Sequence, residues 1–309
     1  MPPTLRPEPA AVDAHQHFWP AGVRPADPRT AAIAGPFAPA DLARELDGGE
    51  VGRTVLVQCA PGAAENDRLA GYAEAFPPVG AVVAWLPLDD PGAAERELDR
   101  VRALTPLVRG FRAAVPEGAE ASAGLLRTAA AAERAGLVWE LVVTGEAHVR
   151  LVERVAAARP ELPIVVDHLA APPLAGSGSA GAWHRWIDRL AALPSVAVKV
   201  SVGLDVLVGW EWRPARLTPY VRYALDAFGA GRAMLAGNWP VIRLAADHPT
   251  AWRALRAAVA AAGASAAELE QVAGGTARRR YRIGADQGRS GTGAGPGATA
   301  TRGPRRTPR

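Results

Sequence analysis

Short apolar segments rich in β-branched residues recur along the chain, and most of them are followed by a stretch of Ala, Arg, Glu and Leu with helical spacing. The apolar segments predict eight strands, at residues 12–17, 54–58, 79–85, 107–112, 138–143, 164–168, 197–201 and 233–237. Strands that alternate with helices pair in parallel through right-handed crossovers. Because eight such units close naturally into a barrel, we expect an α/β fold, a single (β/α)8 barrel of the TIM type over residues 11–284.

The predicted helices fill the gaps between these strands and continue after the last one. They lie at residues 64–76, 93–104, 121–135, 146–158, 182–192, 219–228, 249–262 and 266–281. A doubly wound open sheet is the competing architecture, and it normally has a glycine-rich phosphate-binding turn after its first strand. The first strand here runs instead into HQHFWP at residues 15–20, which favours the barrel.

The composition is that of a protein that can bury a large core, since 49% of the 309 residues are hydrophobic and 21% are charged. The net charge of +4 would by itself suggest an anionic partner such as nucleic acid. However, residues 285–309 hold five arginines against one aspartate, so this segment accounts for the whole excess. It has almost no large apolar residue, and we expect it to be disordered, as we expect residues 1–10 to be flexible. We therefore expect a small-molecule substrate and neither a nucleic-acid nor a membrane partner.

Cysteine content and the first residues narrow the class of protein further. The single cysteine, Cys59, excludes an intramolecular disulfide and any metal site built from several cysteines. The first ten residues lack the apolar stretch of a secretory signal, and no run of about 18 apolar residues is present. We therefore expect a cytoplasmic protein, and the sequence leaves its oligomeric state open.

Three histidines lie at the ends of predicted strands, which is where barrels of this kind carry their catalytic groups. His15 and His17 end the first strand, and their i, i+2 spacing places both imidazoles on the same side of it. His168 ends the sixth strand and is expected at the same opening. Such imidazoles can share a divalent metal or bracket a substrate oxygen. Asp167, the neighbour of His168, is expected to point to the opposite face and to be structural.

Charged residues on three other strands are further candidates. Arg109 and Arg112, on the fourth strand, could clamp a carboxylate or a sugar oxygen. Glu140 is the only charge in a strongly apolar strand, so it must face a polar lumen or a cation. Lys199, the only lysine of the chain, shares a strand face with Ser201 through i, i+2 spacing. We expect the ammonium of this lysine to be turned toward the cavity.

The last strand ends in AGNWPV at residues 236–241, which places Asn238 at the opening of the barrel. Trp239 is expected either to contact the substrate or to pack beneath the loop. His148 falls in a predicted helix and is expected at the surface.

Nine stretches between residue 12 and about residue 284 resemble, in order, the amidohydrolase-related (amidohydrolase family 2) barrels. Within that family the resemblance is to the L-fuconolactonase-like and L-rhamnono-lactonase-like sugar-acid lactonases. The stretches are VDAHQHFWP at 12–20, VLVQCAPGAAEND at 55–67, AVVAWLPLDDP at 81–91, VRGFR at 108–112, GLVWELVV at 136–143, IVVDHLAAP at 164–172, VAVKVSVGL at 196–204, FGAGRAMLAGNWPV at 228–241 and GGTARRRYRIG at 274–284. The resemblance implies a (β/α)8 barrel, with His15 and His17 as the paired histidines, His168 as the strand-6 histidine, and Arg109 and Arg112 among the residues that bind substrate.

Two positions depart from the family pattern. Relatives commonly have GSDWPV on the last strand, whose aspartate acts as a metal ligand or as the base that activates water, whereas this chain has Asn238 there. The residue after VRGFR is often histidine in relatives and is Ala113 here. An amide cannot act as a base near neutral pH, and as a neutral oxygen ligand it holds a metal more weakly than a carboxylate does.

Three explanations of the asparagine remain open. Another group may activate water, with His168, Glu140 or Asp205 as candidates. Alternatively, the reaction needs no metal, and the imidazoles and Lys199 polarise the carbonyl while Asn238 positions the water. In the third explanation the site has lost hydrolysis and only binds its ligand.

The sequence predicts a hydrolase that opens the lactone of a sugar acid or of a similar small carboxylated ring by attack of water on the carbonyl. A divalent metal, Zn or Mn, is the expected cofactor unless the mechanism is metal-independent. The alternatives are a metal-dependent decarboxylase of an unsaturated or aromatic acid and a non-catalytic small-molecule-binding barrel. The predicted catalytic residues are His15, His17, His168, Lys199 and Asn238, with the three histidines as metal ligands, and the predicted substrate-binding residues are Arg109, Arg112, Glu140, Ser201 and Trp239.

Overall fold

The computed structural model describes residues 11–23, 27–47, 49–176 and 178–284, so the segments 1–10 and 285–309 discussed above lie outside the described residues. Eight parallel strands form one sheet in the order β1 to β8, each paired with the next along the chain. The strands are β1 (Ala11–Gln16), β2 (Val51–Val57), β3 (Val79–Trp85), β4 (Val108–Arg112), β5 (Val138–Val142), β6 (Ile164–Asp167), β7 (Val196–Val200) and β8 (Ala233–Leu235). The predicted (β/α)8 barrel is therefore confirmed.

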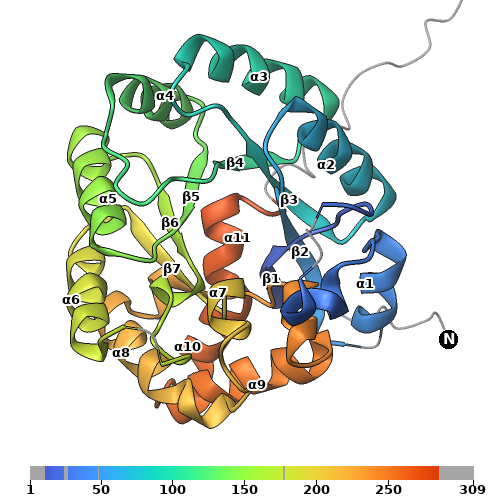
Figure 1. Ribbon diagram of the computed structural model, residues 1–309, viewed down its shortest axis with the longest axis vertical. Coiled ribbons are helices and arrows are strands. Elements are labelled where there is room, and N and C mark those ends of the chain that lie inside the picture. The colour runs from blue at the N-terminus through green and yellow to red at the C-terminus, as the bar shows by residue number, and fades with distance from the viewer. Residues whose placement is uncertain (1–10, 24–26, 48, 177, 285–309) are drawn as a thin grey trace, which may run out of the picture.

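The helices are α1 (Pro39–Leu46), α2 (Ala63–Ala75), α3 (Pro91–Leu104), α4 (Ala123–Arg134), α5 (Glu146–Ala158), α6 (Ala180–Ala191), α7 (Leu204–Leu207), α8 (Thr218–Phe228), α9 (His248–Ala261), α10 (Ala266–Glu270) and α11 (Thr276–Tyr281). Most of them surround the strands on the outside of the barrel, whereas α11 lies in the middle of the view in Figure 1. A π-helical turn, Gln271–Gly275, joins α10 to α11, so the predicted helix at 266–281 is continuous. Neither α1 nor α7 was predicted, because each is short and buries few apolar residues.

The barrel closes where β8 meets β1, just beyond the regular part of β8. There the backbone N–H of Asn238 donates to the carbonyl oxygen of His15 over 2.8 Å. The N–H of Gly237 donates to the carboxylate of Asp13 over 2.7 Å, in place of a ladder bond. Because these bonds replace the regular ladder, β8 ends at Leu235 rather than at the predicted residue 237.

The interior of the barrel is filled by small and β-branched side chains, and α11 closes its N-terminal end. The interior cluster combines strand residues with Ala277 and Tyr281 of α11, which share one helix face through i, i+4 spacing. The side chain of Thr276 donates to the carbonyl of Ala230, which precedes β8, over 2.8 Å. Since this end is sealed, a functional site belongs at the opposite, C-terminal end of the strands.

None of the helices in the described part of the chain has both the length and the apolar character needed to cross a bilayer.

Candidate active site

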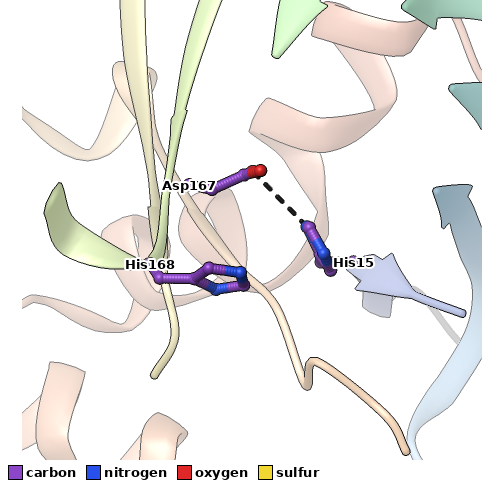
Figure 2. A group of neighbouring side chains, drawn as sticks. All are labelled: His15, Asp167 and His168. Carbon is purple, nitrogen blue, oxygen red and sulfur yellow. Dashed lines mark ion pairs between the residues drawn. The ribbon is translucent and has the colours of Figure 1, made fainter. Parts of the chain in front are cut away.

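The backbone after β6 turns sharply and brings two polar side chains to the mouth of the barrel. The four residues from His168 to Ala171 all have φ between 51° and 53°, a left-handed conformation that residues other than glycine seldom adopt. Regular strand alternation therefore stops at Asp167. Figure 2 shows the carboxylate of Asp167 and the ring of His168 reaching the same space as His15. The expectation that Asp167 would point to the opposite face was wrong, because alternation does not continue through this turn.

The histidine pair of β1 is arranged around a common point. The Nε2 atoms of His15 and His17 lie 3.1 Å apart. The Nδ1 atom of His17 donates to the carbonyl oxygen of Val57 over 2.7 Å, which leaves a lone pair on its Nε2. Two nitrogens bound to one tetrahedral zinc ion would be about 3.3 Å apart, so the observed separation fits a shared metal.

The donors at the mouth fit a divalent cation. His15, Asp167 and His168 each offer a ligand atom, and these atoms lie within 4.8 Å of one another. Asn238 adds an amide oxygen: its Nδ2 donates to the carbonyl of Val202 over 2.8 Å, whereas its buried Oδ1 has no hydrogen-bond partner among the described residues. Imidazole, carboxylate and amide donors suit metals such as zinc and manganese. The structure thus adds Asp167 to the ligand candidates that the sequence predicted.

Lys199 lies beneath the histidines, inside the barrel. Its Nζ is 2.6 Å from Oε2 of Glu140, 2.9 Å from Nδ1 of His15 and 3.1 Å from Oδ1 of Asp167. The contacts with Glu140 and His15 are hydrogen bonds, whereas Oδ1 of Asp167 forms an ion pair with the ammonium group and has no hydrogen-bond partner among the described residues. Glu140 therefore faces a cation, as expected, but it is fully buried beside Lys199 and is not placed to bind substrate.

Ser201 follows β7 and contacts His168 from behind. Its Oγ lies 2.7 Å from Nδ1 of the imidazole. This hydrogen bond fixes the orientation of the ring. Ser201 was predicted to bind substrate, whereas the structure assigns its hydroxyl to His168.

The two arginines of β4 have different positions. Arg112 donates to Oδ2 of Asp167 and to the carbonyl of Gln58, each over 2.9 Å, and its Nη1 lies 3.4 Å from Nε2 of His15. Arg109 instead donates to the carbonyls of Pro106 and Val108 at the start of the strand. A spacing of three residues places two side chains on opposite faces of a strand. The prediction of Arg109 as a site residue was therefore wrong.

Trp239 is fully buried beneath the loop after β8. Its ring packs against Phe37, with 5.4 Å between the ring centroids, and its Nε1 donates to Glu45 over 3.1 Å. The structure thus favours the packing role over a substrate contact.

Burial and neighbouring charges set the protonation states at the mouth. Burial holds the pKa of His15 well below its usual value, and the charge of Lys199 lowers it further. Burial also lowers the pKa of His168 to about 4. For Asp167, burial alone would raise the pKa, but the charge of Lys199 and the other nearby cations hold it well below its usual range. Near neutral pH the site therefore presents neutral imidazoles and an ionised carboxylate, the forms that bind metals.

A cavity of about 380 Å³ lies next to these groups and is joined to them through Arg112. Its polar lining comprises Gln58, Cys59, Arg112, Thr144, His148 and Asp205, and Trp85 forms an aromatic wall. His15, His17 and His168 are buried and do not line the cavity, whereas Arg112 lines it and its Nη1 lies 3.4 Å from Nε2 of His15.

Several lining residues were not predicted to belong to the site. His148 was expected at the surface, but it is buried and its Nε2 lies 3.1 Å from the carbonyl oxygen of Val115. Gln58, Trp85 and Thr144 follow or end β2, β3 and β5. Their positions at the carboxyl ends of strands could have identified them as site residues in the sequence.

Comparisons with known proteins agree with this architecture. The amidohydrolase family model matches residues 12–283. An L-fucono-1,5-lactonase of Burkholderia ambifaria is 37% identical over 241 residues, covering 76% of this chain and 81% of that protein. An L-fucono-1,5-lactonase of Burkholderia multivorans is 30% identical over 293 residues, covering 88% of this chain and 96% of that protein.

A solved structure gives the same result at the level of the fold. The crystal structure of an amidohydrolase from Burkholderia multivorans with bound zinc has a TM-score of 0.79 to this chain at 30% identity. The match covers 88% of this chain and 99% of that one. Since the family model spans nearly the whole barrel, this chain belongs to the amidohydrolase family.

Proposed function

We propose that this protein hydrolyses the lactone of a sugar acid, with L-fucono-1,5-lactone and related δ-lactones as the first candidates. The observation that carries the proposal is the buried group of His15, His17, His168 and Asp167, which Arg112 joins to the neighbouring cavity that it lines. The names of the two lactonase relatives support the choice of substrate class.

In the proposed reaction, water adds to the ester carbonyl of a lactone held in the cavity. Arg112 lies where its guanidinium can donate to the carbonyl or carboxyl oxygen of the ring. His168, neutral near pH 7 and held by Ser201, accepts the proton of the attacking water and returns it to the ring oxygen. The ring C–O bond breaks, and the product is the open hydroxy acid.

The candidates for the water-activating base differ in their surroundings. Glu140 is fully buried and is hydrogen-bonded to Lys199 and Tyr281, so it has no access to the cavity. Asp167 is held as an anion by neighbouring cations, which makes it a poor proton acceptor. These facts favour His168 as the base. The free Oδ1 of Asn238 is suited to orient the water by accepting a hydrogen bond.

A zinc or manganese ion bound here would polarise the carbonyl and lower the pKa of water. We assign its ligands to His15, His17 and His168, with Asp167 and the Oδ1 of Asn238 as further donors. A metal-bound His168 would have no lone pair left for a proton, so the role of His168 as the base belongs to the reaction without a metal on that ring.

A panel of γ- and δ-lactones tests the proposed reaction class. The purified protein is assayed for acid release above the spontaneous rate, with chelator and with added Zn²⁺ or Mn²⁺. We expect at least one aldonolactone to be opened. Release of carbon dioxide from an aromatic acid would instead identify a decarboxylase. Saturable lactone binding without acid release would identify a binding protein.

A further inference from the structure

We propose that Tyr281, on the helix that closes the N-terminal end of the barrel, is a positioning residue for the active site. It fixes Glu140, which fixes Lys199, which in turn orients His15. The inference rests on the lactonase function proposed above, since it assigns a role within that same site. Tyr281 does not line the cavity, so it acts only through its neighbours.

A continuous chain of hydrogen bonds joins the closed end of the barrel to the histidines. The hydroxyl of Tyr281 donates to Oε1 of Glu140. Oε2 of the same carboxylate accepts from Nζ of Lys199 over 2.6 Å, and that Nζ lies 2.9 Å from Nδ1 of His15. All four side chains are fully buried, so water does not replace any of these contacts.

The chemistry of the donors and acceptors determines which group donates in each of these hydrogen bonds. An ammonium group only donates, so in the metal-free protein Nδ1 of His15 accepts from Lys199 and the proton of the ring lies on Nε2. A metal held at this Nε2 would take the place of the proton. That Nε2 lies 3.1 Å from Nε2 of His17, whose other ring nitrogen donates to the carbonyl oxygen of Val57. The position of Lys199 therefore selects the tautomer of His15.

Glu140 depends on Tyr281 to keep Lys199 in this position. Among the described residues, the phenol supplies the one hydrogen bond to Oε1 of Glu140. Burial already raises the pKa of Glu140, and the bond from the phenol opposes this rise. Without it, a buried carboxylate oxygen would be left unsatisfied, so Glu140 would rotate or take up a proton. Lys199 would then lose its shortest contact.

The variant Tyr281→Phe isolates the hydroxyl, because it keeps the ring that lies 5.8 Å from Nζ of Lys199. We expect kcat on the best lactone to fall about tenfold, the usual effect of losing a partner behind the reacting groups, with KM unchanged. In ¹⁵N spectra of the metal-free protein, the Nδ1 signal of His15 should move toward that of an imidazole nitrogen that accepts no hydrogen bond. His15→Ala identifies this signal among those of the six histidines.

Tyr223→Phe is the matched control. The hydroxyl of Tyr223 also donates to a carboxylate, that of Asp188, over 2.8 Å, but the pair joins α8 to α6 on the outside of the barrel. This variant should change neither kcat nor the His15 signal.

A variant that combines Tyr281→Phe with Glu140→Gln tests whether Tyr281 acts through Glu140. Because Tyr281 acts through Glu140, adding Tyr281→Phe to Glu140→Gln should lower kcat no further than Glu140→Gln alone. If the two losses multiply, Tyr281 acts by another route and the proposal is overturned.

Two further outcomes separate this proposal from the proposed function. A Tyr281→Phe protein that melts at a lower temperature but keeps the His15 signal of the wild type would mean that Tyr281 is structural, which overturns the proposal. A wild type that opens no lactone overturns the proposed function instead, and the His15 signal alone then decides the role of Tyr281.

Discussion

Asn238 takes the place of the aspartate found on the last strand of its relatives, and its surroundings show how an amide is accommodated there. Its φ of +53° is a left-handed conformation that both asparagine and aspartate tolerate. The bond from its Nδ2 to Val202 fixes the amide, so the unpartnered Oδ1 remains available for water or a metal. An aspartate would lose this bond and place a carboxylate oxygen against the carbonyl of Val202.

Changing Asn238 to aspartate should therefore have two opposite effects. We expect Asn238→Asp to bind zinc about tenfold more tightly, because a carboxylate replaces a neutral donor. The metal-free variant should be less stable than wild type by about 1–3 kcal/mol. Competition with a chromogenic chelator measures the first effect and urea unfolding the second. Equal zinc affinity in wild type, Asn238→Asp and Asn238→Ala would show that residue 238 is not a ligand.

Single residues were predictable where they contrasted with their strand. Glu140 and Lys199 stood out as charges within apolar segments, and the structure pairs them. Asp167 was misassigned because regular alternation was extended through a left-handed turn. Tyr281 gave no signal, since its partner Glu140 is 141 residues away in sequence.

Two elements determine what the site can contain. The turn after β6 places Asp167 and His168 side by side, and α11 seals the opposite end of the barrel. The strands themselves were predictable from apolar spacing, because parallel strands are buried on both faces. The ends of the strands were harder to predict. A hydrogen bond to the side chain of Asp13 and residues with left-handed backbone conformation determine where β8 and β6 end.

Helix α4 begins in close contact with the loop after β3, and its second residue is a glycine. A Cβ atom at Gly124 would lie 2.5 Å from the carbonyl oxygen of Asp89, whereas a Cβ at Gly71, within α2, would meet nothing within 4 Å. We expect Gly124→Ala to destabilise the protein by about 1–3 kcal/mol through this clash. Gly71→Ala should stabilise it by about 0.5–1 kcal/mol, the usual helical preference. Urea midpoints of the two variants provide the comparison, and a stabilised Gly124→Ala protein would contradict the close approach.

The two ends of the barrel have different roles. The N-terminal end is sealed by α11, whereas the C-terminal end gathers buried titratable groups next to a cavity. The sequence predicted the position of the chemistry, because the polar residues followed the strands, but it did not predict that α11 seals the opposite end. The depth of the histidines could not be predicted, since it depends on how Arg112 and the loops cover them.

This burial makes the stability of the molecule depend on pH. His168 has a pKa of about 4 when folded and an ordinary value near 6.5 when unfolded, so the unfolded chain binds the extra proton between these values. The contribution of His168 to the free energy of unfolding is fully present above about pH 6.5. It decreases by up to about 3 kcal/mol as the pH falls to 4. His168→Gln should remove this part of the slope in urea unfolding measured across that range. An unchanged slope would mean that His168 is not buried in its neutral form.

The central claim is that lactone hydrolysis takes place at the histidine pair of β1. The direct measurement is the rate of acid release from L-fucono-1,5-lactone by wild type, by His15→Ala and by His184→Ala, a control on the outer helix α6. We predict that wild type and His184→Ala open the lactone at equal rates and that His15→Ala falls to the spontaneous rate. Full activity of a folded His15→Ala protein would contradict the account.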